Sequence, residues 1–171
     1  MTEHNGLTAV ADPRLGIDPH RFRSALRRHA TTVTVVTAAG PPPAGFTATS
    51  FTSVSLHPQL VAFSLDRASS SWPVVERAGH VAIHLLRAGQ QGTARTFATS
   101  GIDRFAVHGR WRLGPYGLPL LENPLALLTC SVVQRVVAGD HVLVLCRPVA
   151  AEHGDGEPLL YHMGGYAAVA R

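Results

Sequence analysis

Apolar and β-branched residues recur in short runs along most of the chain, with turn-forming residues between them. Short runs bounded by Gly, Pro, Asn, Asp or Ser are typical of β-strands. The two longest runs flank Gly139 and Asp140, a dipeptide that favours a tight hairpin turn. The pattern predicts strands over 31–37, 45–51, 59–65, 80–86, 126–137 and 141–149, with a loop over 38–44.

Helical periodicity is confined to three short segments. Asp18 followed by Pro19 is typical of a helix start. Apolar residues from Phe22 to Leu26 then share one face, which predicts a helix ending near His29. Two further short helices are predicted, one beginning near Ser71 and Pro73 and one over 92–98. Several antiparallel strands with a few short helices indicate a mainly β fold, a barrel rather than a doubly wound sheet.

Length and composition indicate one domain. The chain has 171 residues, of which 46% are hydrophobic and 15% charged, enough for a single hydrophobic core. We expect a flexible tail over 1–17 and a domain over 18–171. No apolar run is long enough to span a membrane. The polar N-terminus does not resemble a secretory signal, so we expect a cytoplasmic protein that does not associate with membranes.

The two cysteines agree with that compartment. Cys130 and Cys146 both lie inside apolar, β-branched stretches, where free and buried thiols are expected in a reducing environment. A disulfide across paired strands is the less favoured alternative.

The basic residues narrow the chemistry. The net charge is +4, and all 15 basic residues are arginine. A Schiff-base lysine, a lysine general base and a Walker-type phosphate lysine are therefore excluded. Aromatic residues are scattered rather than interleaved with the arginines, which argues against a nucleic-acid interface. No G-x-G-x-x-G segment follows a predicted strand, so any nicotinamide binding is not of the Rossmann kind.

Three segments carry candidate chemistry. The stretch 45–55 combines threonines and serines with small residues, so a planar heterocycle could approach its backbone and find N–H and O–H donors. The serine loop 67–71 precedes a predicted helix start, and hydroxyls, backbone N–H groups and a helix N-terminus together favour an anion. Arg104 could complete a phosphate clamp there. Taken singly, these features are equally typical of a threonine-rich strand, a capped serine-rich loop and a surface arginine.

Histidines give one further candidate and no metal site. His141 directly follows the Gly-Asp turn, from which it could contact a cofactor or donate a proton. A solvent-facing turn histidine is the ordinary alternative. His80 and His84 have a spacing that suits a metal on a helix, but on a strand they stand about 13 Å apart at ~3.3 Å per residue. We predict no metal.

Taken in order, these segments resemble the short-chain flavin reductases, the reductase components of two-component flavin-dependent monooxygenases. The resemblance runs from Phe22 to about Tyr166, nearly the whole chain. The long threonine/serine segment and the Gly-Asp-His hairpin are specific in combination, and neither would suffice alone. The matching segments are 22–23, 33–37, 45–58, 67–71, 97–98, 104–105, 139–141, 158–161 and 165–166.

The resemblance implies a split β-barrel of the Greek-key, FMN-binding type that works as a homodimer. It implies hydride transfer from NADH or NADPH to FMN or FAD, and release of reduced flavin to a partner monooxygenase or halogenase. It assigns Thr47, Ala48, Thr49, Ser50, Phe51, Ser53 and Val54 to the flavin ring and ribityl chain, and Ala68, Ser69, Ser71 and Arg104 to the flavin phosphate. It places Arg23, His141, Gly165 and Tyr166 beside the nicotinamide, with His141 as the catalytic residue.

The chain departs from the family pattern in three places. Thr32 stands where glycine is usual, Phe46 replaces a common methionine, and 57–59 replaces an acidic double-proline turn. None of these removes an implied flavin contact. Phe46 would alter the packing of the ring and thereby the flavin preference.

Two other functions fit the same barrel. One is a flavin-binding electron carrier without nicotinamide turnover, and the other is an oxidase of the pyridoxamine-phosphate type. The His141 hairpin and Gly165-Tyr166 favour the reductase over both, through the resemblance alone. An oligonucleotide-binding barrel is disfavoured by the lack of lysines and aromatic platforms. The sequence leaves open the choices between FMN and FAD and between NADH and NADPH, and the identity of the partner.

Overall fold

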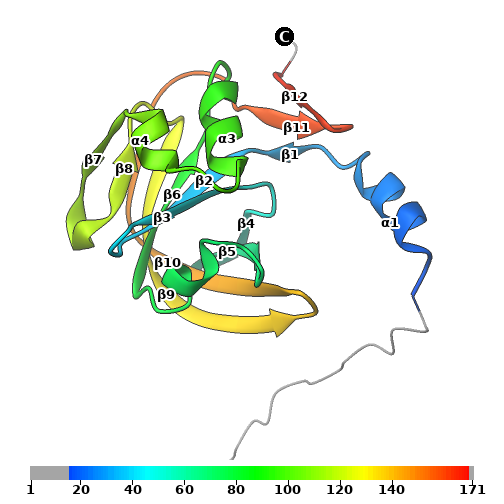
Figure 1. Cartoon of the computed structure of the whole chain (residues 1–171), viewed down its shortest axis with the longest axis horizontal. Coiled ribbons are helices and arrows are strands. Elements are labelled where there is room, and N and C mark those ends of the chain that lie inside the picture. The colour runs from blue at the N-terminus through cyan, green and yellow to red at the C-terminus, as the bar shows by residue number, and fades with distance from the viewer. Residues whose placement is uncertain (1–15, 170–171) are drawn as a thin grey trace, which may run out of the picture.

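In the computed structural model, which describes residues 16–169, seven antiparallel strands form one curved sheet (Figure 1). Its strand order is β3-β2-β6-β9-β10-β5-β4. Antiparallel neighbours need no crossover helix between them, which accounts for the low helix content. The seven strands are β2 (Thr34–Ala38), β3 (Ala44–Ala48), β4 (Thr52–Leu56), β5 (Gln59–Asp66), β6 (His80–Leu85), β9 (Ala126–Ala138) and β10 (His141–His153).

The curved sheet does not close on itself. Strands β3 and β4 are its two edges, and residues 49–51 join them although the two strands do not pair. Packing between β3 and β5 brings the two halves of the sheet together instead. A barrel that stays open between two edge strands is a split barrel. The prediction of a mainly β, split-barrel fold is therefore confirmed.

Smaller elements surround this sheet. Strands β1 (Thr31–Thr32), β11 (Leu160–His162) and β12 (Gly165–Ala167) form a three-stranded sheet, and β7 (Trp111–Leu113) pairs with β8 (Pro119–Leu121). The helices are α1 (Pro19–Leu26), α2 (Trp72–Val75), α3 (Gln91–Ala98) and α4 (Arg104–His108). Figure 1 shows α3 and α4 together against the large sheet, whereas α1 stands apart at the side, beyond β11 and β12.

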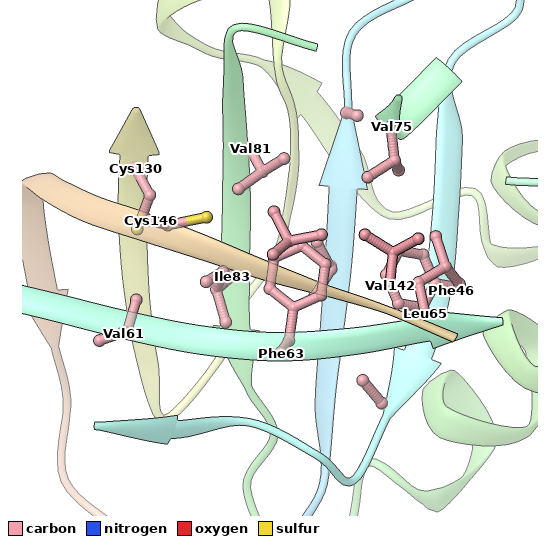
Figure 2. Close-up of a cluster of buried hydrophobic side chains, with 14 residues drawn as sticks. Phe46, Val61, Phe63, Leu65, Val75, Val81, Ile83, Cys130, Val142 and Cys146 are labelled. Carbon is pink, nitrogen blue, oxygen red and sulfur yellow. The ribbon is translucent and has the colours of Figure 1, made fainter. Parts of the chain in front are cut away.

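The main hydrophobic core fills the inside of the curved sheet. Phe63 of β5, Ile83 of β6 and Val142 of β10 are almost fully buried there. Figure 2 shows Phe63 and Ile83 among the other core side chains, between the strands that carry them. Alternate residues of each strand face this interior, as the period of two in an extended chain requires.

A second cluster covers the outer face of β2. All five residues of β2 are buried, because Val36 points into the main core while Val35 packs with Phe97 of α3 on the other face. Because both faces of β2 are covered, the hydroxyls of its two threonines need hydrogen-bond partners within the protein. The hydroxyls of Thr34 and Thr37 donate to backbone carbonyl oxygens at 2.9 and 2.6 Å. Burial of both faces explains why the sequence of β2 is rich in β-branched residues and does not alternate between polar and apolar positions.

Two predicted strands differ from the observed ones. The strand over 31–37 is interrupted at Val33, where the chain passes from the small sheet to the large one. The strand over 45–51 ends at Ala48, and the strand β4, which was not predicted, follows at Thr52–Leu56. Pairing with β5 supplies the backbone partners that this serine-rich segment could not indicate by itself.

The predicted ends of two other elements shift by several residues. The first helix ends at Leu26, one turn before His29, and β10 continues to His153. The Gly-Asp turn lies as predicted, because Ala138 pairs with His141 on either side of it. The predicted tail over 1–17 lies almost wholly outside the described residues.

The two cysteines are buried and free. Burial raises the pKa of both thiols to about 12, so neither carries a reactive thiolate near neutral pH. None of the helices within residues 16–169 has the length and hydrophobicity needed to cross a lipid bilayer.

Candidate active site

A polar cavity opens where β3, β5, α3, α4 and the start of β10 meet. Its volume is about 510 Å³, within the range of small-molecule and cofactor sites. Hydroxyl groups, one arginine, one histidine and one carboxylate form its polar wall. These side chains come from Thr47, Thr49, Ser50, Ser64, Asp66, Ser69, Ser100, Arg104 and His141.

Hydrogen bonds fix the loop that follows β3. The Thr47 hydroxyl donates to a backbone carbonyl oxygen of α3 at 2.7 Å. The Ser50 hydroxyl accepts from the N–H of Ser64 at 2.9 Å and donates to the carbonyl oxygen of the same residue at 3.1 Å. Within residues 16–169, the N–H groups of Thr49, Ser50 and Phe51 donate to no protein acceptor. The loop therefore presents backbone donors that a bound heterocycle could satisfy.

The serine loop turns on Asp66. Its carboxylate accepts from the N–H of Ala68 at 2.8 Å, and its carbonyl oxygen accepts from the N–H of Ser69 at 3.0 Å. The Ser69 hydroxyl oxygen accepts from the N–H of Ser71 at 3.2 Å and keeps its own hydrogen to donate. The N–H of Ser70 has no acceptor in the described part of the chain. The helix start predicted near Ser71 and Pro73 is confirmed, although α2 is a single turn.

Arg104 is held rigidly at the start of α4. Its Nε donates to the carbonyl oxygen of Thr99 at 2.8 Å. Its Nη1 donates to the carbonyl oxygen of Gly45 at 2.8 Å and to the hydroxyl of Ser71 at 3.0 Å. The Nη2 group has no acceptor among residues 16–169, so its N–H donors remain for an anion. Burial lowers the pKa of the guanidinium, which stays charged because arginine titrates far above neutral pH.

His141 lies directly after the turn that joins β9 and β10. It is the first residue of β10 and pairs with Asp66 on one side and Ala138 on the other. Its Nδ1 lies 2.7 Å from Oδ1 of Asp140, and this hydrogen bond holds the pKa of the Asp140 carboxyl below its usual range. The Nε2 atom has no protein partner in the described chain, and the residue lines the polar cavity.

Comparison with known families decides the class of the protein. A family model described as "Flavin reductase like domain" matches residues 26–170. The chain belongs to this family. A flavin reductase of this kind needs a site for a flavin and room for a nicotinamide cofactor beside it, which sets the requirements for the polar cavity.

Relatives cover nearly all of this flavin reductase. It is 44% identical over 165 residues to an NADH:FMN oxidoreductase from Rhodococcus qingshengii, covering 92% of this chain and 86% of the relative. It is 36% identical over 171 residues to the reductase subunit of a flavin-dependent monooxygenase from Rhodococcus jostii, covering 99% of this chain and 86% of the relative.

A solved structure extends the comparison to the fold. The structure of a Streptomyces globisporus NADH:FAD oxidoreductase, determined in complex with NAD and FAD fragments, superposes with a TM-score of 0.85 at 34% identity. The match covers 93% of this chain and 95% of that one. The split-barrel architecture is thus shared with a protein whose name describes the reduction of a flavin by NADH.

The donors of the polar cavity fit a flavin. A flavin ring carries its nitrogen and oxygen acceptors along one edge, and the free N–H groups of Thr49 and Ser50 match that requirement. The flavin phosphate needs a cation and neutral donors, and the Nη2 group of Arg104 and the hydroxyl of Ser69 supply them.

The structure gathers most of the residues assigned to the flavin, but not all. Phe51 lies in a separate hollow with the residues that follow α1. Ser53 and Val54 are exposed on the edge strand β4. The Ser71 hydroxyl is buried and bonded to Gly45 and Arg104, outside the polar cavity. The lining includes the other members of the set, which are Thr47, Ala48, Thr49, Ser50, Ala68, Ser69 and Arg104, together with His141, which was assigned to the nicotinamide.

Three residues assigned to the nicotinamide lie at a different place. Arg23 is on α1, and Gly165 and Tyr166 are on β12. None of them lines the polar cavity. The end of α1 is joined to the turn before β12, because Arg27 and Met163 exchange two hydrogen bonds of 3.0 Å. The Tyr166 ring stacks under the guanidinium of Arg95 of α3, 5.7 Å from its centre.

Seven lining residues were not predicted to lie in the site, and Ser64, Phe97 and Ser100 are three of them. Ser64 stands between Phe63 and Leu65 and is the one hydroxyl in the apolar middle of β5, which is a signal the sequence did contain. Phe97 closes the cavity from α3, and Ser100 follows the end of that helix. Nothing in the local sequence marks Ser100, because only the packing of α3 on β3 brings it to the cavity.

The histidines of β6 lie in different surroundings. Within the described residues, no group of three or more metal-ligating side chains comes together. His84 is fully buried and structural: its Nδ1 lies 3.0 Å from the carbonyl oxygen of Val35, and its Nε2 accepts from the N–H of Leu121 at 3.0 Å. Burial lowers its pKa to about 4, so the ring is neutral in the fold.

Proposed function

We propose that the chain is an NAD(P)H:flavin oxidoreductase that supplies reduced flavin to a partner flavin-dependent monooxygenase or halogenase. The observation that carries this is the polar cavity, in which free backbone donors and an immobilised arginine match a flavin and its phosphate. Family membership and relatives named NADH:FMN and NADH:FAD oxidoreductase support the reaction class. The relative that is a monooxygenase reductase subunit supports the partner.

The side chains of the site bind and orient. When bound, the flavin supplies a hydride acceptor for the nicotinamide. Thr47 and Ser50 hold the loop whose N–H groups would meet the ring, and Arg104 would neutralise the phosphate. None of these roles needs a nucleophile or a metal, so the protein contributes orientation and preorganised hydrogen-bond donors. Because the ring contacts are neutral donors, the flavin can leave after reduction.

Oxidation of NADH by purified protein, with and without added FMN or FAD, tests the function. NADH should be consumed only when a flavin is present, and NADPH should serve less well. If a flavin binds but NADH is not consumed in air, the chain is an electron carrier on the same barrel. An excess of a flavin-dependent monooxygenase together with its substrate should capture the reduced flavin, pass one oxygen atom of O2 to the substrate and lower the yield of hydrogen peroxide.

His141 is the proposed catalytic residue. With Nδ1 held by Asp140, its Nε2 is left to contact the nicotinamide or the charge that grows on the ring. His141→Ala should lower turnover 10- to 100-fold, about 1.4–2.7 kcal/mol, with little change in flavin affinity. His57→Ala, in the exposed turn between β4 and β5, is the control. Wild-type turnover in His141→Ala would make His141 an ordinary turn residue.

A homodimer would complete the site. Val54 and Leu56 of β4 are exposed, and so are Val136 and Leu143, which face each other across β9 and β10. Apolar groups gathered on adjacent strands are typical of an interface. The apolar face of α1 is also uncovered. We propose that a second copy covers these surfaces and brings Arg23, Ser53, Val54, Gly165 and Tyr166 to the flavin and the nicotinamide.

The cytoplasm is the proposed location. The reaction draws on NADH or NADPH and on a partner oxygenase, and the two buried, unbridged thiols suit a reducing compartment.

A further inference from the structure

A second cavity lies against the polar cavity, on the other side of Arg104. Its volume is about 550 Å³. The loop between β2 and β3, helix α2 and helix α4 form its wall, which is mainly apolar. Pro43, Val74, Ile102, Phe105, Ala106 and Trp111 supply most of this surface. We call it the apolar cavity.

The two cavities meet at Arg104. Its side chain lines both. Elsewhere they are lined by consecutive residues of the same segments: Phe46 and Ser69 belong to the polar cavity, and Gly45 and Ser70 to the apolar one. An anion bound by the free Nη2 group of Arg104 therefore sits where a ligand could extend into either cavity.

We propose that the apolar cavity binds the adenosine half of FAD, which makes FAD rather than FMN the preferred flavin. This rests on the proposed function, specifically on a flavin phosphate at Arg104. FAD differs from FMN by continuing from that phosphate through a second phosphate to adenosine. The unpartnered N–H of Ser70 lies on the apolar side of the junction and is a donor for the second phosphate.

The wall of the apolar cavity suits adenine better than a charged group. A purine is flat and has apolar faces, and the ring of Trp111 and the side chains of Pro43 and Ile102 offer surfaces for them. The carboxylate of Asp103 is already the N-cap of α4, where it accepts from the N–H groups of Phe105 and Ala106 at 3.1 and 3.0 Å. Both bonds use Oδ1, so Oδ2 remains an acceptor that the amino group of adenine could reach.

The adenosine of the nicotinamide cofactor is the competing occupant, but it suits the position less well. The residues assigned to the nicotinamide on α1 and β12 contribute nothing to the apolar cavity. A flavin anchored at Arg104 instead reaches it directly, through the phosphate itself. The relatives named for FMN and for FAD leave the preference open, whereas a built cavity beyond the phosphate favours the larger flavin.

Filling the apolar cavity tests the proposal. Ala106 is exposed on α4 and lines the cavity, so Ala106→Trp should block it without disturbing the core. Val107→Trp is the matched control, because Val107 is the next residue of the same helix, is 63% exposed and does not line the cavity. Ile102→Ser removes apolar surface without adding bulk. Dissociation constants for FAD and FMN are measured separately by quenching of flavin fluorescence.

The wild type should bind FAD at least 10-fold more tightly than FMN. Ala106→Trp should weaken FAD binding at least 10-fold and FMN binding less than 2-fold, Ile102→Ser should weaken FAD alone, and Val107→Trp should change neither. Equal affinities of the wild type for the two flavins, or equal losses in Ala106→Trp, would overturn the adenosine site. Oxidation of NADH with FMN by Ala106→Trp separates that result from failure of the reductase proposal. Binding of neither flavin by the wild type would overturn both.

Discussion

Helices α1 and α3 each have eight residues and an amphipathic pattern, yet only one of them is packed. In α3, Ala94 and Phe97 are fully buried against β2 and β3. In α1, Phe22 and Leu26 are each 52% exposed, and no residue of the helix is buried. An amphipathic pattern thus predicts a helix correctly without showing that the same chain supplies the surface it packs on.

The environment of each helix explains the difference. Phe97 fits where Gly45 leaves room: a Cβ on Gly45 would lie 2.6 Å from the Phe97 ring. Phe105 meets the same ring edge-on at 5.3 Å. No residue of α1 is buried, and only its C-terminal end is joined to the β11–β12 turn by hydrogen bonds. The stability of the fold should therefore depend on α3 and hardly on α1.

The largest expected effect comes from truncating the packed helix. Phe97→Ala should lower the free energy of unfolding by about 3–5 kcal/mol, the usual loss for a buried phenylalanine. Phe22→Ala should lower it by less than about 0.5 kcal/mol at protein concentrations where the chain is monomeric. Urea denaturation measures both. Comparable losses would show that α1 packs on its own chain after all.

A second test uses the protonation of His84, a buried histidine of β6. The pKa of His84 in the fold is about 4, below its usual value of 6.5, because burial disfavours the charged ring. The unfolded chain therefore binds a proton that the folded chain does not, once the pH falls below about 6.5. Stability from this group is complete above pH 6.5 and is lost as the pH falls towards 4, by about 3 kcal/mol.

Urea denaturation between pH 7 and pH 4 measures this loss. His84→Gln keeps an amide donor and acceptor for Val35 and Leu121 but cannot titrate in this range. Its free energy of unfolding should therefore depend less on pH than that of the wild type. An unchanged pH dependence in the variant would assign the effect to other groups.

The third test asks whether a second copy covers α1. Leu26→Asp places a charge on the exposed apolar face, so it should weaken dimerisation at least 10-fold, about 1.4 kcal/mol, and leave the monomer folded. Val107→Asp, on the exposed side of α4, is the control. Light scattering across a dilution series measures the fraction of dimer. A wild-type dimer unaffected by Leu26→Asp would place the interface elsewhere.

The smallest effect should come from the helix caps, which form a matched pair. Asp103 accepts from two N–H groups at the start of α4, and Asp18 does the same for α1. Asp103→Ala should lower the free energy of unfolding by about 1 kcal/mol. Asp18→Ala should leave it almost unchanged and appear only as faster hydrogen exchange within α1. Equal losses in global stability would again place α1 in the cooperative fold.

The long strands could be predicted because their buried residues form continuous apolar runs in the sequence. The hairpin around Gly139 and the apolar middle of β5 are visible as runs and turn residues. The strands β7, β8, β11 and β12 were missed, as was α4. The strands among these have three residues each, too few to show a period of two, and β11 is paired on its other side by β1 from the far end of the chain. Such elements leave no periodicity to detect.

The candidate site was likewise only partly predictable from the sequence. Thr47, Ser69 and Arg104 could be connected through the resemblance, and the structure places them in one cavity. The sequence could not show that the Ser71 hydroxyl is used to hold Arg104, because that contact depends on how α2 packs against α4. Nor could it show the apolar cavity, whose wall combines segments more than 60 residues apart, from Pro43 to Trp111.

The join between α1 and the β11–β12 turn affects how fast any partner could be recognised. The guanidinium of Arg27 fits into the turn because Gly164, with φ of 85°, has no side chain there: a Cβ would lie 2.7 Å from it. The helix is therefore already oriented before anything covers its apolar face. Less rotational and torsional freedom is then lost on association, and a larger share of encounters is productive. Loosening this turn would slow docking of α1 more than it would hasten its release.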